Sequence, residues 1–343
     1  MPAERPILLA TRGSALALAQ TNMVLAQCRA AFPRLQFEMK IIKTTGDKLQ
    51  TASMAQEGKS LPKGLFTKEL EVALVDNQAD LAVHSLKDLP TELPPGLVLG
   101  AVGERADVRD VLLYRDAAYG QTAEADKDEI AGSHGEVVRR GFKAGLRVRD
   151  LPEGAVVATS STRRRAQLLA VNPGLKSPDI RGNVATRMQK LATKPEFDAT
   201  ILALAGLTRL HFVISPQGRL EGDAVPEGIL ATVLGTDEML PCVGQGAIGL
   251  EIRASDERLV NICERLNHRP TMVCVTAERS FLAAMGGGCQ SPVAAHAEVS
   301  GENIRMTALS FVSGPLRRAR ASRPLAQAAE LGRQLADQLR AAG

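Results

Sequence analysis

Short apolar runs alternate with amphipathic stretches of helical periodicity along the first part of the chain, a pattern typical of an α/β fold. The predicted elements are, in order, a strand at Ile7–Ala10, a helix at Ala15–Ala31, a strand at Phe37–Ile42, a helix at Phe66–Asp76, and strands at Leu81–His84 and Leu97–Val102. Because strands that alternate with helices join through crossovers, this order predicts a largely parallel sheet.

A second series of strands and helices follows the first. Its predicted elements are a strand at Ala155–Thr159, helices at Thr162–Val171 and Asn183–Leu191, a strand at Ala199–Leu204, and a strand with a glycine-bearing turn within Pro241–Ile252. The stretch Arg115–Asp150 is charged and poor in periodic apolar residues, so we expect an exposed insertion there.

The last part of the chain has a different pattern. A helix is predicted at Pro270–Met285, strands at Val293–Val299, Ile304–Val312 and Leu316–Ala321, and a final helix at Leu325–Arg340. Consecutive strands with helices at both ends indicate a separate α+β domain.

Composition narrows the class of protein. The chain has 343 residues, enough for two or three domains, and it contains neither a long apolar run nor a signal-peptide pattern. We therefore expect a cytoplasmic protein with no membrane partner. Aromatic residues make up 3% and the net charge is +4, which argues against a nucleic-acid-binding domain. The five cysteines form no CxxC pair, so neither a disulfide framework nor a metal site is predicted.

Three strand-to-helix junctions combine small polar residues with arginines. They are Thr11–Ser14, Thr159–Arg164, and Arg181–Asn183 with Arg187 one turn later. A helix N-terminus presents free N–H groups, and a neighbouring arginine completes an anion site. The alternative is that the small residues are ordinary caps and the arginines are solvated; three such junctions favour a ligand with several carboxylates or phosphates.

Lys87 and Asp88 follow a buried strand and precede Pro90, so they should lie at the strand's carboxyl end. A carboxylate among arginines can accept N–H hydrogen bonds or stabilise a developing cation. A surface ion pair between Lys87 and Asp88 is the alternative. His84 is predicted to be a packed strand residue.

Cys289 follows three glycines between a predicted helix and a strand. Glycine permits tight loops, and nearby arginine would make the thiol nucleophilic. The alternative is a flexible hinge with an incidental cysteine. Cys242, Cys263 and Cys274 lie in apolar contexts and are expected to pack as small hydrophobic residues.

These residues belong to a series of motifs that resembles the porphobilinogen deaminase, or hydroxymethylbilane synthase, family. The motifs are ATRGSALAL (10–18), TTGD (44–47), KGLFTKELE (63–71), VHSLKDLP (83–90), ATSSTRRRAQL (158–168), RGNVATR (181–187), LALAGLTRL (202–210), VGQGA (243–247), TAERSFL (276–282) and GGCQSP (287–292). They occur in family order along nearly the whole chain.

The resemblance implies two doubly wound α/β domains like those of periplasmic binding proteins, plus a small C-terminal α+β domain. Domain 1 would comprise residues 1–104 and 241–264, because the chain returns to it. Domain 2 would comprise residues 105–240, with the insertion at about 115–150, and domain 3 residues 268–343.

The resemblance also implies the chemistry. A dipyrromethane cofactor would be attached to Cys289 through a thioether. Four molecules of porphobilinogen would be added to it stepwise, each losing ammonia, and the linear tetrapyrrole hydroxymethylbilane would be released for haem biosynthesis. The enzyme would be a monomer.

Residue roles follow from the matched motifs. Asp88 would be catalytic, binding pyrrole N–H groups and stabilising the cation formed as ammonia leaves. The cofactor would be bound by Cys289, Lys87, Arg163, Arg164, Ser161, Thr159, Arg181, Gly182, Asn183 and Gln245. The substrate would be bound by Arg12, Ser14, Arg187, Arg209 and, from a lid loop, Lys59.

The sequence departs from the family pattern at several positions. Gly286 and Ala284 replace a usual Glu and a usual basic residue, and Leu61-Pro62 replaces glycines of the lid.

Two other functions are possible from the sequence. One is a non-catalytic anion-binding module of the same fold, which would need neither Asp88 nor Cys289. The other is a thiol hydrolase that uses Cys289 with His296, for which no orienting acid is evident.

Overall fold

The computed structural model describes residues 5–47, 66–120, 140–288, 291–312 and 314–341. The chain forms two compact units. Unit 1 comprises Met1–Asp107 and Cys242–Gly343, and unit 2 comprises Val108–Pro241. Each unit is described by itself below.

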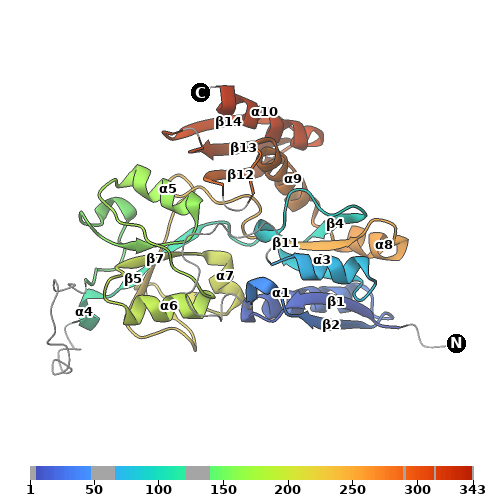
Figure 1. Ribbon diagram of the computed structural model, residues 1–343, viewed down its shortest axis with the longest axis horizontal. Coiled ribbons are helices and arrows are strands. Elements are labelled where there is room, and N and C mark those ends of the chain that lie inside the picture. The colour runs from blue at the N-terminus through green and yellow to red at the C-terminus, as the bar shows by residue number, and fades with distance from the viewer. Residues whose placement is uncertain (1–4, 48–65, 121–139, 289–290, 313, 342–343) are drawn as a thin grey trace. The chain divides into compact units, whose positions relative to one another are not determined.

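Unit 1 contains a mixed five-stranded sheet (Figure 1). Its strand order is β2 (Phe37–Ile42), β1 (Ile7–Arg12), β3 (Leu81–Ser85), β11 (Ile248–Arg253) and β4 (Leu97–Val102). β1 runs parallel to β2 and β3, whereas β11 runs antiparallel to both β3 and β4. The chain therefore returns to this sheet after unit 2.

Helices cover both faces of this sheet. On one face, α1 (Ala15–Ala31) and α8 (Glu257–Leu266) pack against alternate strand residues such as Leu9 and Val83. On the other face, α3 (Lys68–Val75) packs against Ala10 and Ala82. Ala10 follows Leu9 on β1, and Ala82 precedes Val83 on β3. Successive strand side chains point to opposite faces, so the sheet is doubly wound, as predicted.

Unit 2 has a second mixed sheet, ordered β10 (Ile229–Val233), β5 (Asp110–Arg115), β7 (Ala199–Ala203) and β6 (Val157–Ala158). The helices that accompany it are α5 (Thr162–Val171), α6 (Val184–Thr193) and α7 (Leu204–Arg209), and a short α4 spans Ala117–Gly120. Leu168 of α5 packs on one side of the sheet, and Met188 of α6 on the other. A hairpin of β8 (Val213–Ile214) and β9 (Leu220–Glu221) completes the unit.

Most of the described residues in the segment Arg115–Asp150 are exposed, as expected, but Arg115 and Val148 are buried. Arg115 closes β5, is only 5% exposed, and donates a hydrogen bond of 2.6 Å to the carbonyl of Leu191. Val148 is fully buried, and the ring of Phe142 packs edge-on against Tyr114. Residues 121–139 lie outside the described part of the chain.

The last part of the chain, the C-terminal module, has the predicted α+β arrangement, and it is grouped within unit 1. It consists of α9 (Arg269–Ala284), the antiparallel strands β12 (Val293–Ser300), β13 (Asn303–Ser310) and β14 (Arg317–Pro324), and α10 (Ala328–Ala341). One face of this sheet shares a core with α9 and α10. β14 is an edge strand in which every second residue is exposed, including Arg318 and Arg320, and such charged edges oppose pairing with other chains.

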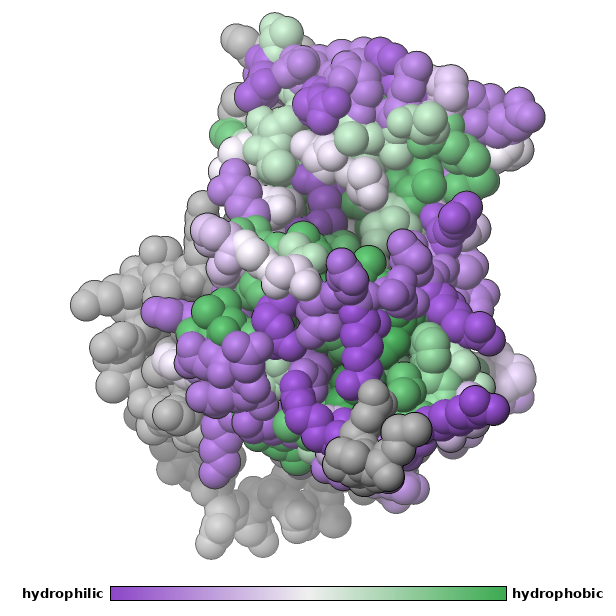
Figure 2. All heavy atoms as spheres, turned by 90° about the vertical axis from the view of Figure 1, so that its right-hand side faces the viewer, coloured by the Kyte–Doolittle hydropathy of each residue, from purple (hydrophilic) through white to green (hydrophobic). Residues whose placement is uncertain are grey.

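The outward side of α10 is charged. Arg333 pairs with Glu330, and Arg340 with Asp337, both at helical spacing. In Figure 2 the upper edge of this module is mostly hydrophilic. Among the described helices, none combines the length and apolar character that crossing a bilayer requires.

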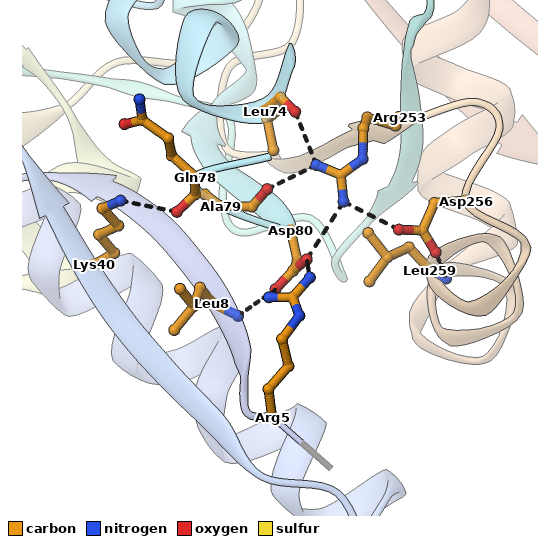
Figure 3. A network of polar contacts seen from close by, with 10 residues as sticks. All are labelled: Arg5, Leu8, Lys40, Leu74, Gln78, Ala79, Asp80, Arg253, Asp256 and Leu259. Atoms are coloured by element: carbon orange, nitrogen blue, oxygen red, sulfur yellow. Dashed lines mark hydrogen bonds and ion pairs between the residues drawn. The ribbon is translucent and has the colours of Figure 1, made fainter. Parts of the chain in front are cut away.

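One polar network ties the start of the chain to β11 in unit 1 (Figure 3). Arg253 donates to the carbonyls of Leu74 and Ala79 at 2.8 and 2.7 Å, and pairs with Asp80 and Asp256. Asp80 also accepts two hydrogen bonds from Arg5 and one from the backbone N–H of Leu8. The guanidinium of Arg253 thus binds the carbonyl of Leu74, in the last turn of α3, and that of Ala79, in the segment between α3 and β3.

We predict that Gly332→Ala destabilises the C-terminal module. Gly332 lies where α10 crosses α9, and a Cβ there would meet the carbonyl oxygen of Ala277 and lie 2.7 Å from the backbone nitrogen of Phe281. Overpacking of this kind costs about 1–3 kcal/mol, more than alanine gains in helix propensity. Circular dichroism should show a Tm lower by roughly 2–10 °C.

Gly103→Ala is the matched control, because a Cβ at Gly103 meets nothing within 4 Å. A Gly332→Ala protein as stable as that control would contradict the close helix crossing.

Candidate functional site

The carboxyl ends of β2, β1 and β3 meet at one edge of the sheet in unit 1, because these strands are parallel. The predicted residues Arg12, Ser14, Lys87 and Asp88 are therefore brought to the same edge. β11 runs the other way, so the loop before it, Gly244–Ala247, also lies at this edge. Such edges are where ligands bind in doubly wound sheets.

Arg12 ends β1, and its guanidinium is held in place by the protein itself. It bonds to Asp47 at 2.5 Å and lies over the ring of Phe66, with its carbon 4.2 Å from the ring centroid. Asp47 is fixed in turn by the hydroxyl of Thr44 at 2.7 Å. Burial acts to raise the pKa of Asp47, but the hydrogen bonds from Arg12 and Thr44 lower it below its ordinary value.

Ser14 is an N-cap in addition to its predicted role as a ligand. Its hydroxyl accepts a hydrogen bond from the backbone N–H of Ala17 at the start of α1. The N-terminus of a long helix therefore lies beside Arg12, and both features favour a negatively charged group.

Lys87 and Asp88 lie on a short 3-10 turn, Leu86–Asp88, directly after β3. The backbone N–H of Leu86 donates to the carbonyl of Ala247 at 3.0 Å, which joins the turn to the glycine loop. Gly244 has φ +72°, and a Cβ there would lie 3.3 Å from the backbone nitrogen of Lys87. Only glycine allows the loop to support the turn so closely.

The carboxylate of Asp88 is half-buried and forms no ion pair with Lys87 or with any other residue that the structure describes. The alternative of a surface ion pair between these two neighbours is therefore wrong. His84, on the preceding strand, is a packed residue as expected, because it is 5% exposed and lies 2.9 Å from Glu251.

Two glutamines lie near this edge. Gln245, predicted to bind the cofactor, is fully buried, and its side-chain oxygen accepts from the thiol of Cys242 at 3.4 Å. Gln20 of α1 accepts a hydrogen bond from Ser85 at 3.0 Å. The amide nitrogen of Gln20 is buried, and no described residue is its hydrogen-bond partner.

Unit 2 has a comparable edge at the ends of β6 and β7, which run parallel. Ser161 caps α5 by accepting from the backbone N–H of Arg164, and the buried hydroxyl of Thr159 accepts from the N–H of Ser161 at 3.2 Å. β5 runs antiparallel to β7, so its first residue, Asp110, lies opposite Ala203 at the same edge.

Asp110 accepts one hydrogen bond from Arg163 and one from Arg164, each at 2.7 Å. The two arginines are only 4% and 6% exposed, and Asp110 is fully buried. Burial acts to raise the pKa of Asp110, but the two guanidinium groups lower it far below its ordinary value. One carboxylate serves two arginines, so the cluster retains a net positive charge.

The third predicted junction is also formed in unit 2. Asn183 caps α6 by accepting from the backbone N–H and the hydroxyl of Thr186, at 2.8 and 2.9 Å. Arg187 donates to the carbonyl of Gly182 at 2.8 Å, and Arg181 is exposed. Gly182 has φ +118°, a conformation that strongly favours glycine.

Arg209 ends α7, and burial lowers its pKa to about 10. The remaining predicted site residues, Cys289 and Lys59, and the lid positions Leu61-Pro62, lie outside the described residues.

The segment that leads to Cys289 begins at the end of α9. Gly286 has φ +65°, and its backbone N–H donates to the carbonyl of Ala283, while that of Gly287 donates to the carbonyl of Leu282. This is the pattern of a helix that ends at a glycine. It gives a physical reason for glycine at position 286, where the family usually has Glu.

The burial of the other thiols was predicted only in part. Burial raises the pKa of Cys263 to about 12 and of Cys274 to about 11, as expected for packed residues. The expectation was wrong for Cys242, which is partly exposed.

Sequence reasoning missed the carboxylates that hold the arginines. Asp47 was visible as the acid of the TTGD motif, but nothing in the sequence connects it to Arg12. Asp110 begins a strand that was not predicted. Only the register of the sheet brings it to Arg163 and Arg164.

The donors at both edges fit an acidic ligand. In unit 1 the buried amide nitrogen of Gln20, and in unit 2 the buried Nε of Arg164, have no hydrogen-bond partner among the described residues. Buried donors of this kind are normally satisfied, and ligand carboxylates would satisfy them. No group of His, Cys, Asp and Glu in the described ranges could hold a metal ion. The fold and these edges define an α/β protein suited to a ligand rich in carboxylates.

Comparison with known proteins shows the family. Residues 7–261 match the family model "Porphobilinogen deaminase, dipyromethane cofactor binding domain", and residues 272–341 match "Porphobilinogen deaminase, C-terminal domain". The chain therefore belongs to the porphobilinogen deaminase family.

Curated relatives carry the same name. Porphobilinogen deaminase of Brevibacillus brevis is 41% identical over 305 residues, which are 89% of this chain and 84% of the relative. That of Gloeobacter violaceus is 40% identical over 344 residues, covering 99% of this chain and 92% of the relative. Among solved structures, the BenM effector-binding domain with benzoate aligns with a TM-score of 0.39 at 13% identity, over 77% of this chain and 91% of that domain. This likeness is too weak to bear on the fold.

We predict that Asp110→Asn destabilises unit 2 by about 3–5 kcal/mol, because it leaves two buried guanidinium groups without their shared carboxylate. Since the folded-state pKa of Asp110 is lowered, its contribution is complete above the unfolded pKa of about 4 and declines as the pH falls below it. Urea unfolding should therefore show a constant difference from wild type between about pH 5 and 8 that shrinks below about pH 4.

Asp179→Asn is the control, because Asp179 also pairs with an arginine, Arg165, but is exposed. Equal, small effects of the two substitutions would contradict a structural role for the Asp110 cluster.

Proposed function

We propose that this protein is a transferase that joins four porphobilinogen molecules head to tail, with loss of ammonia, onto a cysteine-linked dipyrromethane and then releases hydroxymethylbilane. Family membership over nearly the whole chain supports this function. The observation that carries it is the half-buried carboxylate of Asp88, which has no ion-pair partner in the described part of the chain and lies at the same sheet edge as Arg12.

Asp88 would act on the pyrrole nitrogen. Loss of ammonia from porphobilinogen leaves a positive charge that is shared between the methylene carbon and the ring N–H. A carboxylate that accepts a hydrogen bond from that N–H stabilises the charge as it develops. A carboxylate already paired with a lysine would be much less effective, which is why the absence of a Lys87 ion pair matters.

The arginines would bind the acidic side chains. Each porphobilinogen has two carboxylates, so the bound chain becomes more negative at every step. Arg12, Arg187 and Arg209, with Ser14 and Lys59, are proposed to bind substrate. Lys87, Arg163, Arg164, Arg181 and Gln245, with Thr159, Ser161, Gly182 and Asn183, are proposed to bind the cofactor. Arg163 and Arg164 would act mainly through the net positive charge of their cluster, because Asp110 and backbone carbonyls hold their guanidinium groups.

Cys289 is proposed to carry the dipyrromethane through a thioether. The bound dipyrromethane supplies the terminal pyrrole carbon to which the first substrate is joined. Helix α9 ends at Ala284, and Gly286, with φ +65°, follows it three residues before Cys289.

The finer features of the function are also proposals. We propose that the enzyme is a cytoplasmic monomer that acts without nucleic acid or membrane. We also propose three domains, comprising residues 1–104 with 241–264, residues 105–240, and residues 268–343.

Intact-mass spectrometry tests the attachment. Wild-type protein should carry the extra mass of two pyrrole units, and Cys289→Ala should lack it because the thioether sulfur is gone. Cys242→Ala is the control and should retain the extra mass, since Cys242 is a partly exposed thiol among the described residues. A fully active wild-type chain with no added mass would refute the attachment.

Substitution of Asp88 tests the catalytic role. Asp88→Ala should fold normally but lose at least about 100-fold in kcat, because stabilisation of the cation rather than ground-state binding is removed. Steady-state assays of hydroxymethylbilane formation measure this, with the exposed Glu92→Ala as control. Near-normal kcat in Asp88→Ala would rule out the proposed role.

A further inference from the structure

Helix α9 of the C-terminal module supports the turn that bears Asp88. Leu86 and Leu89, which flank Lys87 and Asp88, share a buried apolar cluster with Val275 of α9, and Met272 packs against the same cluster. The apolar residues of the turn are therefore packed against a helix that is remote in sequence.

Arg279, one turn further along α9, bonds to the backbone that follows Asp88. It donates to the carbonyls of Leu89 at 3.1 Å, of Pro90 at 2.6 Å and of Thr91 at 3.4 Å. Burial lowers the pKa of Arg279 to about 10, so the guanidinium remains charged at neutral pH. A planar guanidinium can satisfy several carbonyls at once, which a lysine cannot.

The neighbouring residue, Glu278, holds the other side of the same turn. Its fully buried carboxylate accepts two hydrogen bonds from Arg105, one from the N–H of Gly244 at 2.8 Å and one from the N–H of Ala297 at 2.9 Å. Gly244 belongs to the loop that packs against the backbone of Lys87.

The turn needs these contacts because it has little internal hydrogen bonding. Within it, the N–H of Leu89 bonds to the carbonyl of Leu86 at 3.1 Å, and a single 3-10 turn is not a rigid element. A shift of about 1 Å in a catalytic group can cost on the order of 100-fold in rate. The same α9 ends at Ala284, shortly before Cys289.

We propose that Arg279 is a positioning residue for the reaction: by binding the carbonyls of residues 89–91 it fixes the Asp88 carboxylate relative to the helix that leads into the cysteine loop. This inference rests on the proposed role of Asp88. Arg279 touches no reacting atom and acts only through the backbone of the turn.

The test compares the holoenzyme of Arg279→Met with wild type in steady-state assays. Arg279→Met should lower kcat by about 10- to 100-fold and change KM by less than about 3-fold, because ligand arginines are untouched while the carboxylate is misplaced. Arg279→Lys should recover part of kcat, since one ammonium can still bind a carbonyl. If Arg279→Met fails to fold, Arg279→Lys is tested instead. Its kcat should lie below that of wild type while its KM changes little.

Arg253→Met is the matched control. Arg253 also binds two backbone carbonyls in unit 1, those of Leu74 in α3 and of Ala79 just before β3 (Figure 3). It should lower Tm without changing kcat by more than about 2-fold at a temperature where all variants are folded. An equal loss of kcat in Arg253→Met would show that general destabilisation explains the result, and would overturn the proposal.

A double-mutant cycle separates this inference from the proposed function. In an Asp88→Ala background, Arg279→Met should reduce the remaining rate by no more than about 2-fold, because its effect passes through Asp88. A full loss in that background, or kcat near wild type in Arg279→Met alone, would overturn the positioning role. Normal turnover in Asp88→Ala alone would instead refute the proposed function.

Discussion

Pairing between guanidinium groups and carboxylates within the protein is the interaction on which both sheet edges depend. Arginines that gather to bind an acidic ligand repel one another, and burying a guanidinium without a partner is costly. In unit 1, Asp47 holds Arg12. In unit 2, Asp110 is shared by Arg163 and Arg164 and leaves that cluster with a net positive charge. The carboxylates therefore fix the arginines, and in unit 2 one carboxylate does so without cancelling the positive charge of both.

Sheet topology supplies these carboxylates. In each unit, parallel strands bring their carboxyl ends to one edge, and an antiparallel strand brings its beginning to that edge. β5 delivers Asp110 in this way, and β11 delivers the loop around Gly244 that supports the Asp88 turn. In unit 1 this requires the chain to return after unit 2. The long-range connection is thus part of the site and not only of the fold.

Much of the fold could be predicted because local signals agree with the tertiary structure. α1 and α5 begin and end where predicted, since Ser14 and Ser161 are N-caps that accept backbone N–H groups. β5 was missed because it starts with Asp110 and ends with Arg115, and both are charged residues buried only through distant partners. The inward orientation of Arg163 and Arg164 could not be predicted for the same reason. It depends on a strand whose register no local pattern reveals.

The charge arrangement separates Asp88 from the acids that hold arginines. Asp47 and Asp110 each bind arginine, and Glu278 binds Arg105 and backbone N–H groups, so these acids are committed to structure. Asp88 has no ion pair within the described residues, yet the backbone around it is held by α9 and the glycine loop. A fixed backbone that presents an uncommitted carboxylate is preorganised for a charge that appears only during reaction. On the proposed function, the structural acids would neutralise permanent positive charge, and Asp88 would stabilise a transient one.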